Sequence, residues 1–115
     1  MKQILVTGAT GFLGSRTVER LSVMPGLSIR ATGRKLKTNN QVKADNVHYM
    51  LGDLNDSDFV SQLVDGVDYI VHAAALSSPW GIKDDFWQSN VNPTKLLLEA
   101  ATREEVKRFV FISTP

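Results

Sequence analysis

Short apolar runs alternate with amphipathic segments along the chain, and each type of segment predicts one kind of element. Runs rich in β-branched residues predict five strands, at residues 3–7, 27–32, 47–51, 68–74 and 107–113. Apolar residues at helical spacing predict helices from residue 12, over residues 55–64 and over about residues 83–105. Pro93 within the last helix predicts either a kink or a fresh start with Asn92 as the cap.

The order of these segments is β-α-β-β-α-β-α-β, with short connections between most of them. Strands that alternate with helices in this way predict an α/β fold with a parallel sheet. We expect a doubly wound sheet of five strands in the order 3-2-1-4-5, because right-handed crossovers then divide the helices between its two faces. The 115 residues match the size of one domain.

Composition and charge exclude several classes of protein. The net charge is +1, 43% of the residues are hydrophobic and there is no cysteine. A disordered chain, a disulfide scaffold and a thiolate metal site are therefore excluded, and two histidines make any metal site improbable. No apolar run approaches the ~18 residues of a membrane span, and no sustained basic face indicates a nucleic-acid partner. We expect a cytoplasmic protein.

A turn with glycine at every third position is the motif in the sequence that indicates most about function. Gly8, Gly11 and Gly14 follow a predicted strand and precede a predicted helix. Gly8 permits a tight turn, Gly11 leaves room for a pyrophosphate beside the backbone, and Gly14 lets the helix pack closely. Free N–H groups and the dipole at the helix N-terminus favour a phosphate there. The alternative is a turn that serves chain geometry alone.

The chain resembles the extended short-chain dehydrogenases/reductases, which include nucleotide-sugar epimerases, dehydratases and 3β-hydroxysteroid-type dehydrogenases. The motifs that carry the resemblance, in order, are TGATGFLG (7–14), GDL (52–54), HAAA (72–75), SNVNPT (89–94) and RFVFIST (108–114). Trp80-Gly81 and the ending Ser113-Thr114-Pro115 are most similar to the 3β-hydroxysteroid dehydrogenase branch. The resemblance covers the whole chain and implies a Rossmann-type domain that binds NAD(P).

The resemblance also implies which residues bind the dinucleotide. Asp53 would bind the adenine amino group and Leu54 would pack on the adenine ring; the alternative for Asp53 is a buried turn that caps the next helix. The small side chains at residues 73–75 would let the cofactor lie against the fourth strand, or they simply pack the core. The complete expected set is Gly8, Thr10, Gly11, Phe12, Leu13, Gly14, Arg34, Asp53, Leu54, Ala73, Ala74 and Ala75.

Arg34 bears on the choice between NADP and NAD. An NAD site places an acidic residue ~20 positions beyond the glycines, where it binds the ribose 2′-hydroxyl. Gly33 stands 19 residues beyond Gly14, Arg34 follows it, and no acid occurs from residue 20 to residue 44. A guanidinium can pair with a 2′-phosphate, so we favour NADP, with NAD as the alternative. The structural alternative is an exposed basic loop that binds no ligand.

The resemblance implies a catalytic hydroxyl at Thr114, with Ser113 as a weaker candidate. A Tyr-x-x-x-Lys pair would complete the site, but Tyr49 and Tyr69 are followed four residues on by Asp53 and Ala73. We therefore expect the N-terminal part of a longer enzyme, inactive as this chain. One face of the last two strands should be bare, exposing either Phe109 and Phe111 or Val110 and Ile112, and it invites association or a homodimer.

These observations lead to three hypotheses about function. The favoured one is the NADP(H)-binding part of an oxidoreductase that transfers a hydride to or from a hydroxyl or keto group of a small-molecule substrate. The second is an NAD-dependent nucleotide-sugar epimerase or dehydratase. The third is a non-catalytic domain that binds a dinucleotide. His72 is interpreted as a strand histidine whose hydrogen bonds are satisfied, rather than as a base or a ligand.

Overall fold

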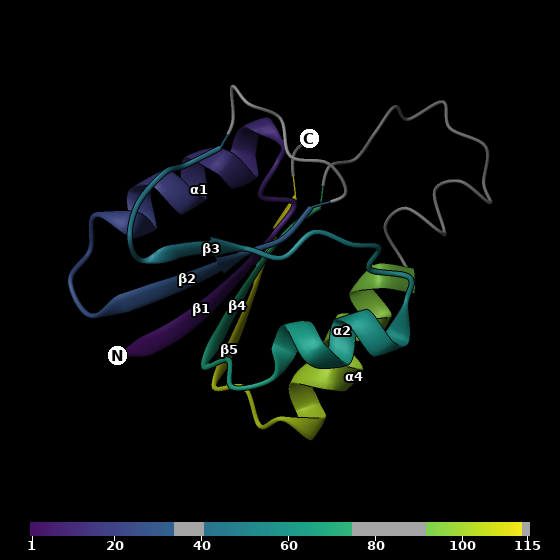
Figure 1. The fold of residues 1–115 in the computed structure, drawn as a ribbon. Helices are drawn as coiled ribbons and strands as arrows, with labels where there is room; N and C mark the ends of the chain where they lie inside the picture. The colour runs from purple at the N-terminus through teal and green to yellow at the C-terminus, as the bar shows by residue number, and fades with distance from the viewer. Residues whose placement is uncertain (34–40, 75–91, 114–115) are drawn as a thin grey trace.

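The computed structural model describes residues 1–33, 41–74 and 92–113 (Figure 1). The elements lie close to the predicted ranges, in the order β1 (Lys2–Thr7), α1 (Phe12–Ser22), β2 (Leu27–Ala31), β3 (Val47–Tyr49), α2 (Ser57–Val64), β4 (Tyr69–Ala74), α4 (Asn92–Arg103) and β5 (Arg108–Ser113). The described part of helix α4 begins at Asn92, and residues 83–91, on which the choice between a kink and a fresh start depends, lie outside the described residues.

All five strands are parallel and form one sheet in the order β3-β2-β1-β4-β5, which confirms the predicted fold. Helix α1 lies on one face of the sheet, and α2 and α4 lie together on the other (Figure 1). The arrangement follows from right-handed crossovers, which send the chain to opposite faces on the two sides of β1. The fold is therefore the doubly wound, Rossmann-type α/β architecture.

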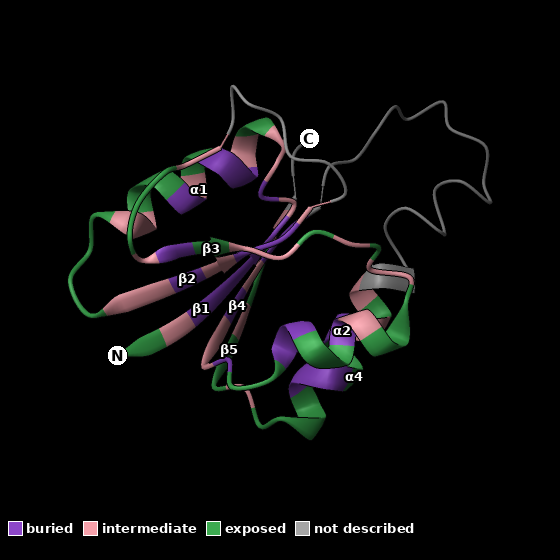
Figure 2. Ribbon diagram, in the orientation of Figure 1, coloured by how far each residue is buried: buried purple, intermediate pink, exposed green. Residues whose placement is uncertain are grey.

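Alternating residues of the strands supply two separate cores, because successive side chains point to opposite faces of the sheet. Ile4 and Val6 of β1 pack with Val18 of α1 and with Ile29 of β2. Leu5 of the same strand faces the other way and joins the apolar residues of α2 and α4. Buried residues accordingly line the centre of the sheet and the inner faces of the helices (Figure 2).

Two predicted boundaries were wrong. Helix α2 begins at Ser57 rather than at residue 55, because the side chain of Asp56 caps it by accepting hydrogen bonds from the N–H groups of residues 58 and 59. Strand β3 ends at Tyr49 rather than at residue 51. The last register pair of the two strands is Ala31 and Tyr49, although backbone hydrogen bonds continue beyond it, from the N–H of Met50 to the carbonyl of Ala31 (2.9 Å) and from the N–H of Gly52 to the carbonyl of Gly33 (3.1 Å).

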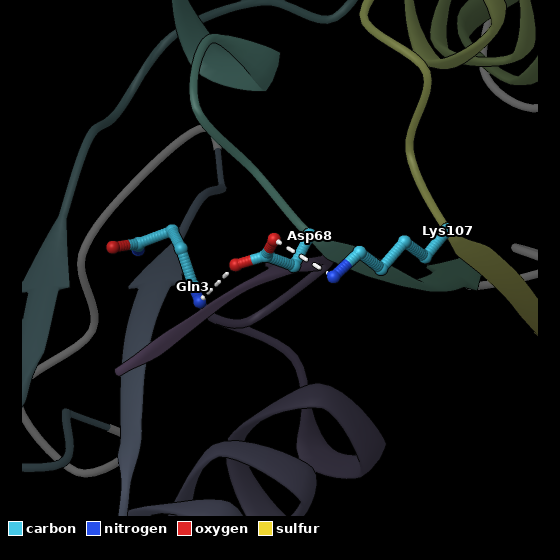
Figure 3. A network of polar contacts seen from close by, with 3 residues as sticks. All are labelled: Gln3, Asp68 and Lys107. Carbon is cyan, nitrogen blue, oxygen red and sulfur yellow. Dashed lines mark hydrogen bonds and ion pairs between the residues drawn. The ribbon is translucent and has the colours of Figure 1, made fainter.

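A carboxylate ties three strands together at the amino edge of the sheet (Figure 3). Asp68 accepts a hydrogen bond from the N–H of Gln3 on β1 (2.9 Å), and its other oxygen lies 4.0 Å from Nζ of Lys107, next to β5. The Gln3 N–H holds the pKa of Asp68 below its usual value. This network lies at the end of the sheet opposite the glycine turn.

Strand β5 forms one edge of the sheet and carries exposed apolar side chains. Val110 is 47% exposed and Phe111 is 50% exposed, whereas Phe109 and Ile112 are half-buried. The sequence predicted that one of two alternating pairs, residues 109 and 111 or residues 110 and 112, would be exposed. Instead, one residue of each pair is exposed. Phe109 packs against the core beneath α2 and α4, so that face is covered only near the start of the strand. In the described part of the chain, no helix is long and apolar enough to cross a membrane.

Candidate dinucleotide site

The predicted site residues gather at the carboxyl edge of the sheet. The glycine turn follows β1, residues 32 and 33 follow β2, and Asp53 lies beyond β3. Strand β1 lies between β2 and β4, so the turn sits where the strand order reverses direction. Ligands of open α/β sheets bind in the crevice at this point.

Gly8 makes the sharp exit from β1. Its φ is +64°, a left-handed conformation that other residues rarely adopt. A Cβ at this position would also collide with the carbonyl oxygen of Ala73 on β4. The turn therefore requires glycine here both for its backbone conformation and for its close approach to β4.

The other two glycines of the turn have different surroundings. A Cβ on Gly14 would lie 2.5 Å from the carbonyl carbon of Gly8 and 2.9 Å from Cα of Ala9, so the start of α1 packs directly on the turn. Among the described residues, a Cβ on Gly11 would meet only the Gly8 carbonyl oxygen, at 3.4 Å. The described part of the turn therefore leaves room beside Gly11, where the sequence analysis expects the pyrophosphate.

The N-terminus of α1 has the features of an anion site. Gly11 is the N-cap residue, no side chain of the described residues caps the helix, and its first turn contains no acidic residue. The N–H groups of Phe12, Leu13 and Gly14 have no partner within the helix, as at any helix start. Open space beside uncapped N–H groups fits a phosphate. Phe12 is 73% exposed, and the guanidinium carbon of Arg16 lies 5.1 Å from its ring centroid.

The end of β2 is joined to the glycine turn. The N–H of Ala9 donates to the carbonyl of Thr32 (2.9 Å), and a Cβ on Gly33 would collide with the side chain of Thr10. Residue 34 follows directly, although Arg34 itself lies outside the described residues. The sequence singled out Gly33 only because it occupies the position at which an NAD site has an acidic residue. The contact of Gly33 with Thr10 was not predicted, because no local pattern indicates it.

Asp53 and Leu54 lie on the connection from β3 to α2. Asp53 is exposed, and its Oδ1 accepts hydrogen bonds from the backbone N–H (2.9 Å) and side-chain amide (3.2 Å) of Asn55. The buried capping role weighed for Asp53 is wrong, since Asp56 caps α2. Leu54 is half-buried against the core beneath α2 and α4. Their predicted contacts with adenine remain predictions.

The end of β4 contributes a buried histidine beside the turn. Ala73 is buried beneath Gly8, and Ala74 ends the strand. His72 is 3% exposed; its Nδ1 contacts Oγ1 of Thr7, and its Nε2 lies 2.8 Å from Oγ1 of Thr94. Burial lowers the pKa of His72 to about 4, so the ring is neutral at physiological pH. Both nitrogens are paired, as the sequence interpretation held.

Two further predicted site residues, Ala75 and Thr114, lie outside the described residues. Within residues 1–33, 41–74 and 92–113, no three histidine or carboxylate side chains come together as a metal site would require. The described edge therefore combines a glycine turn, a helix N-terminus and an adjoining neutral histidine.

Comparison with known proteins gives the family. Residues 4–115 match the model of the NAD dependent epimerase/dehydratase family. The chain belongs to this family. Members of the epimerase/dehydratase family use NAD(P), and the glycine turn described above lies within the matched residues. This agrees with the resemblance drawn from the motifs.

Relatives in this epimerase/dehydratase family include several kinds of enzyme. A dTDP-glucose 4,6-dehydratase of Streptomyces niveus is 36% identical over 97% of this chain, and a 3β-hydroxysteroid dehydrogenase/Δ5→4-isomerase of Mycobacterium tuberculosis is 34% identical over 97%. The crystal structure of uronate dehydrogenase from Agrobacterium tumefaciens is similar with a TM-score of 0.84 and 32% identity over 99% of this chain. A mutant of that dehydrogenase complexed with NAD gives a TM-score of 0.81 and 31% identity.

The chain spans only part of these proteins. It covers 38% of the Streptomyces dehydratase, 31% of the Mycobacterium dehydrogenase and 41% of the uronate dehydrogenase chain. What is common to them over this stretch is the Rossmann-type, NAD(P)-binding portion of the epimerase/dehydratase family.

Proposed function

We propose that this chain is the dinucleotide-binding part of an NADP(H)-dependent oxidoreductase that acts on a hydroxyl or keto group. The observation that carries the proposal is the glycine turn at the reversal of strand order. There, the described residues leave room beside Gly11 and place no side-chain cap on the N-terminus of α1. When bound, the nicotinamide would supply hydride transfer. In this proposal Thr114 hydrogen-bonds the substrate oxygen.

The residues of this chain would hold the dinucleotide by its phosphates and its adenosine end. The N–H groups of residues 12–14 would bind the pyrophosphate, because they have no partner within the helix and lie at the positive end of the α1 dipole. The adenosine end would lie toward β2, where Gly33 packs against Thr10. Arg34 follows Gly33 and would pair with the 2′-phosphate.

The preference for NADP rests on charge at the end of β2. No acid occurs from residue 20 to residue 44, so that stretch has no carboxylate to repel a 2′-phosphate or to accept hydrogen bonds from a 2′-hydroxyl as an NAD site does. Arg34, the first residue after Gly33, would add a favourable charge. The proposal therefore predicts that NADPH binds more tightly than NADH.

An NAD-dependent nucleotide-sugar epimerase or dehydratase is the second candidate. It is favoured by the 36% identity to a dTDP-glucose 4,6-dehydratase and by the similar solved structure that holds NAD. The two candidates differ in cofactor preference. An epimerase of this kind would bind NADH more tightly than NADPH, and its cofactor would survive purification.

Calorimetric titration of the protein with NADPH and with NADH tests the proposal. Arg34→Ala should weaken NADPH binding by about 1.5–3 kcal/mol, the usual contribution of hydrogen bonds to a charged group, and leave NADH binding nearly unchanged. Lys43→Ala is the matched control, because it removes one exposed positive charge from the same basic stretch. Equal losses for both dinucleotides, or an equal effect of the control, would refute the role of Arg34.

A further inference from the structure

His72 links two parts of the fold that are distant in sequence. Its strand β4 pairs with β1 in a register that places His72 opposite Thr7, and the two side chains touch through Nδ1 and Oγ1. The other ring nitrogen, Nε2, lies 2.8 Å from Oγ1 of Thr94, in the first turn of α4. One buried imidazole therefore joins β1 to the beginning of α4.

The β1 end of this link leads directly into the glycine turn. Thr7 is the last residue of β1, and Gly8 follows it with its left-handed backbone against the carbonyl of Ala73. On β4, His72 thus contacts Thr7, and the next residue, Ala73, contacts Gly8. A shift of the imidazole would move the first residue of the turn.

The imidazole is also shielded on its β5 side. The ring centroids of Phe109 and Phe111 lie 6.1 Å and 5.4 Å from that of His72. A neutral imidazole donates from one nitrogen and accepts at the other, and a threonine hydroxyl can do either. The two hydroxyls therefore satisfy a neutral ring in either tautomer and hold it in one orientation.

We propose that His72 is a positioning residue, which holds the glycine turn through Thr7 in the geometry that binds the dinucleotide and makes that geometry depend on α4 through Thr94. This inference rests on the proposed function. It assigns Thr94 an effect on cofactor affinity, although α4 contributes none of the residues predicted to bind the cofactor.

Titration of threonine variants with NADPH and NADH tests this link. Thr94→Val keeps the shape of the side chain and removes the hydroxyl, and it should weaken binding of the dinucleotide that wild type prefers by about 3- to 10-fold. Thr94→Ser, which retains the hydroxyl, should restore the affinity. The matched control is Thr102→Val, because Thr102 lies on the same helix and hydrogen-bonds only to the carbonyl of Leu98 (2.8 Å) among the contacts described.

A double-mutant cycle separates positioning from a general loss of stability. Thr7→Val should also weaken binding, and the double variant Thr7→Val/Thr94→Val should bind no more weakly than the worse single variant, because either change breaks the same link. The inference is overturned if Thr94→Val binds like wild type, if Thr102→Val has the same effect, or if the two losses multiply.

The ¹⁵N signals of the His72 ring provide a readout that is independent of affinity. Thr94→Val should shift the Nε2 signal in the ligand-free protein, and Thr7→Val should shift the Nδ1 signal. Unchanged signals overturn the link itself. A wild-type protein whose ring signals respond in this way but which binds neither dinucleotide overturns the proposed function, and the positioning role falls with it.

Discussion

Acidification should destabilise the fold through His72. The ring has a pKa of 6.5 in an unfolded chain and about 4 in the fold, where burial disfavours the charged form. As pH falls from 6.5 to 4, the unfolded state therefore takes up a proton that the folded state does not. The free energy of unfolding should fall across this range by about 3 kcal/mol, because each pH unit between the two values contributes about 1.36 kcal/mol, and His72 should cause no further loss below pH 4.

The buried position of His72 keeps this effect from being screened. In the described part of the chain, no charged side chain forms a hydrogen bond or an ion pair with the ring, whose described partners are two threonines and two phenylalanines. None of the charged residues on the elements packed against His72 is among these partners; they are Lys2, Lys95, Glu99, Arg103 and Arg108.

Urea unfolding at a series of pH values measures the effect by comparing variants. In His72→Gln the non-titrating side chain removes the proton uptake, so its stability should vary less between pH 6.5 and pH 4 than that of wild type. His48→Gln is the control for the exchange of histidine for glutamine, because His48 is exposed on β3. Parallel curves for wild type and His72→Gln would refute the reasoning.

Two further predictions concern packing and a helix terminus, and urea unfolding measures both. Gly14→Ala should lower the free energy of unfolding by about 3 kcal/mol or more, because the added Cβ would meet the backbone of Gly8 and Ala9 rather than a side chain that can move. A decrease of less than ~1 kcal/mol would contradict the close packing of α1 on the turn. Arg30→Met should cost about 1–2 kcal/mol, because Nη1 of Arg30 donates to the carbonyls of residues 63 (2.6 Å) and 65 (2.9 Å) at the end of α2. Lys43→Met, at an exposed position, should cost much less, and equal losses would argue against this capping role.

The sequence predicted the fold because local patterns carried most of it. Apolar runs, helical spacing and the glycine turn gave the order of elements, and handedness rules then left one strand order. Boundaries were less certain where several residues could play the same role. Residues 53, 55, 56 and 58 are all Asp or Asn and can all cap a helix, and only the three-dimensional structure identifies Asp56 as the cap.

Contacts between distant residues could not be predicted. His72 lies 65 residues from Thr7 and 22 residues from Thr94, and Arg30 lies 33 residues from the carbonyl of Leu63 that it caps. No periodicity or motif encodes such pairs, because they arise only when the sheet brings the elements together. The positions of the turn glycines were predictable, whereas the contact of Gly33 with Thr10 was not.

Dinucleotide binding by Gly11→Val tests the central claim most directly. Gly11 has extended backbone, with φ −85° and ψ 175°, and among the described residues a Cβ there meets one atom at 3.4 Å, so valine should leave the fold intact. Calorimetry should show that the variant binds neither NADPH nor NADH, while its unfolding free energy stays within ~1 kcal/mol of wild type and the exposed control Ala44→Val binds normally. Binding retained by a folded Gly11→Val protein would mean that the turn serves chain geometry alone.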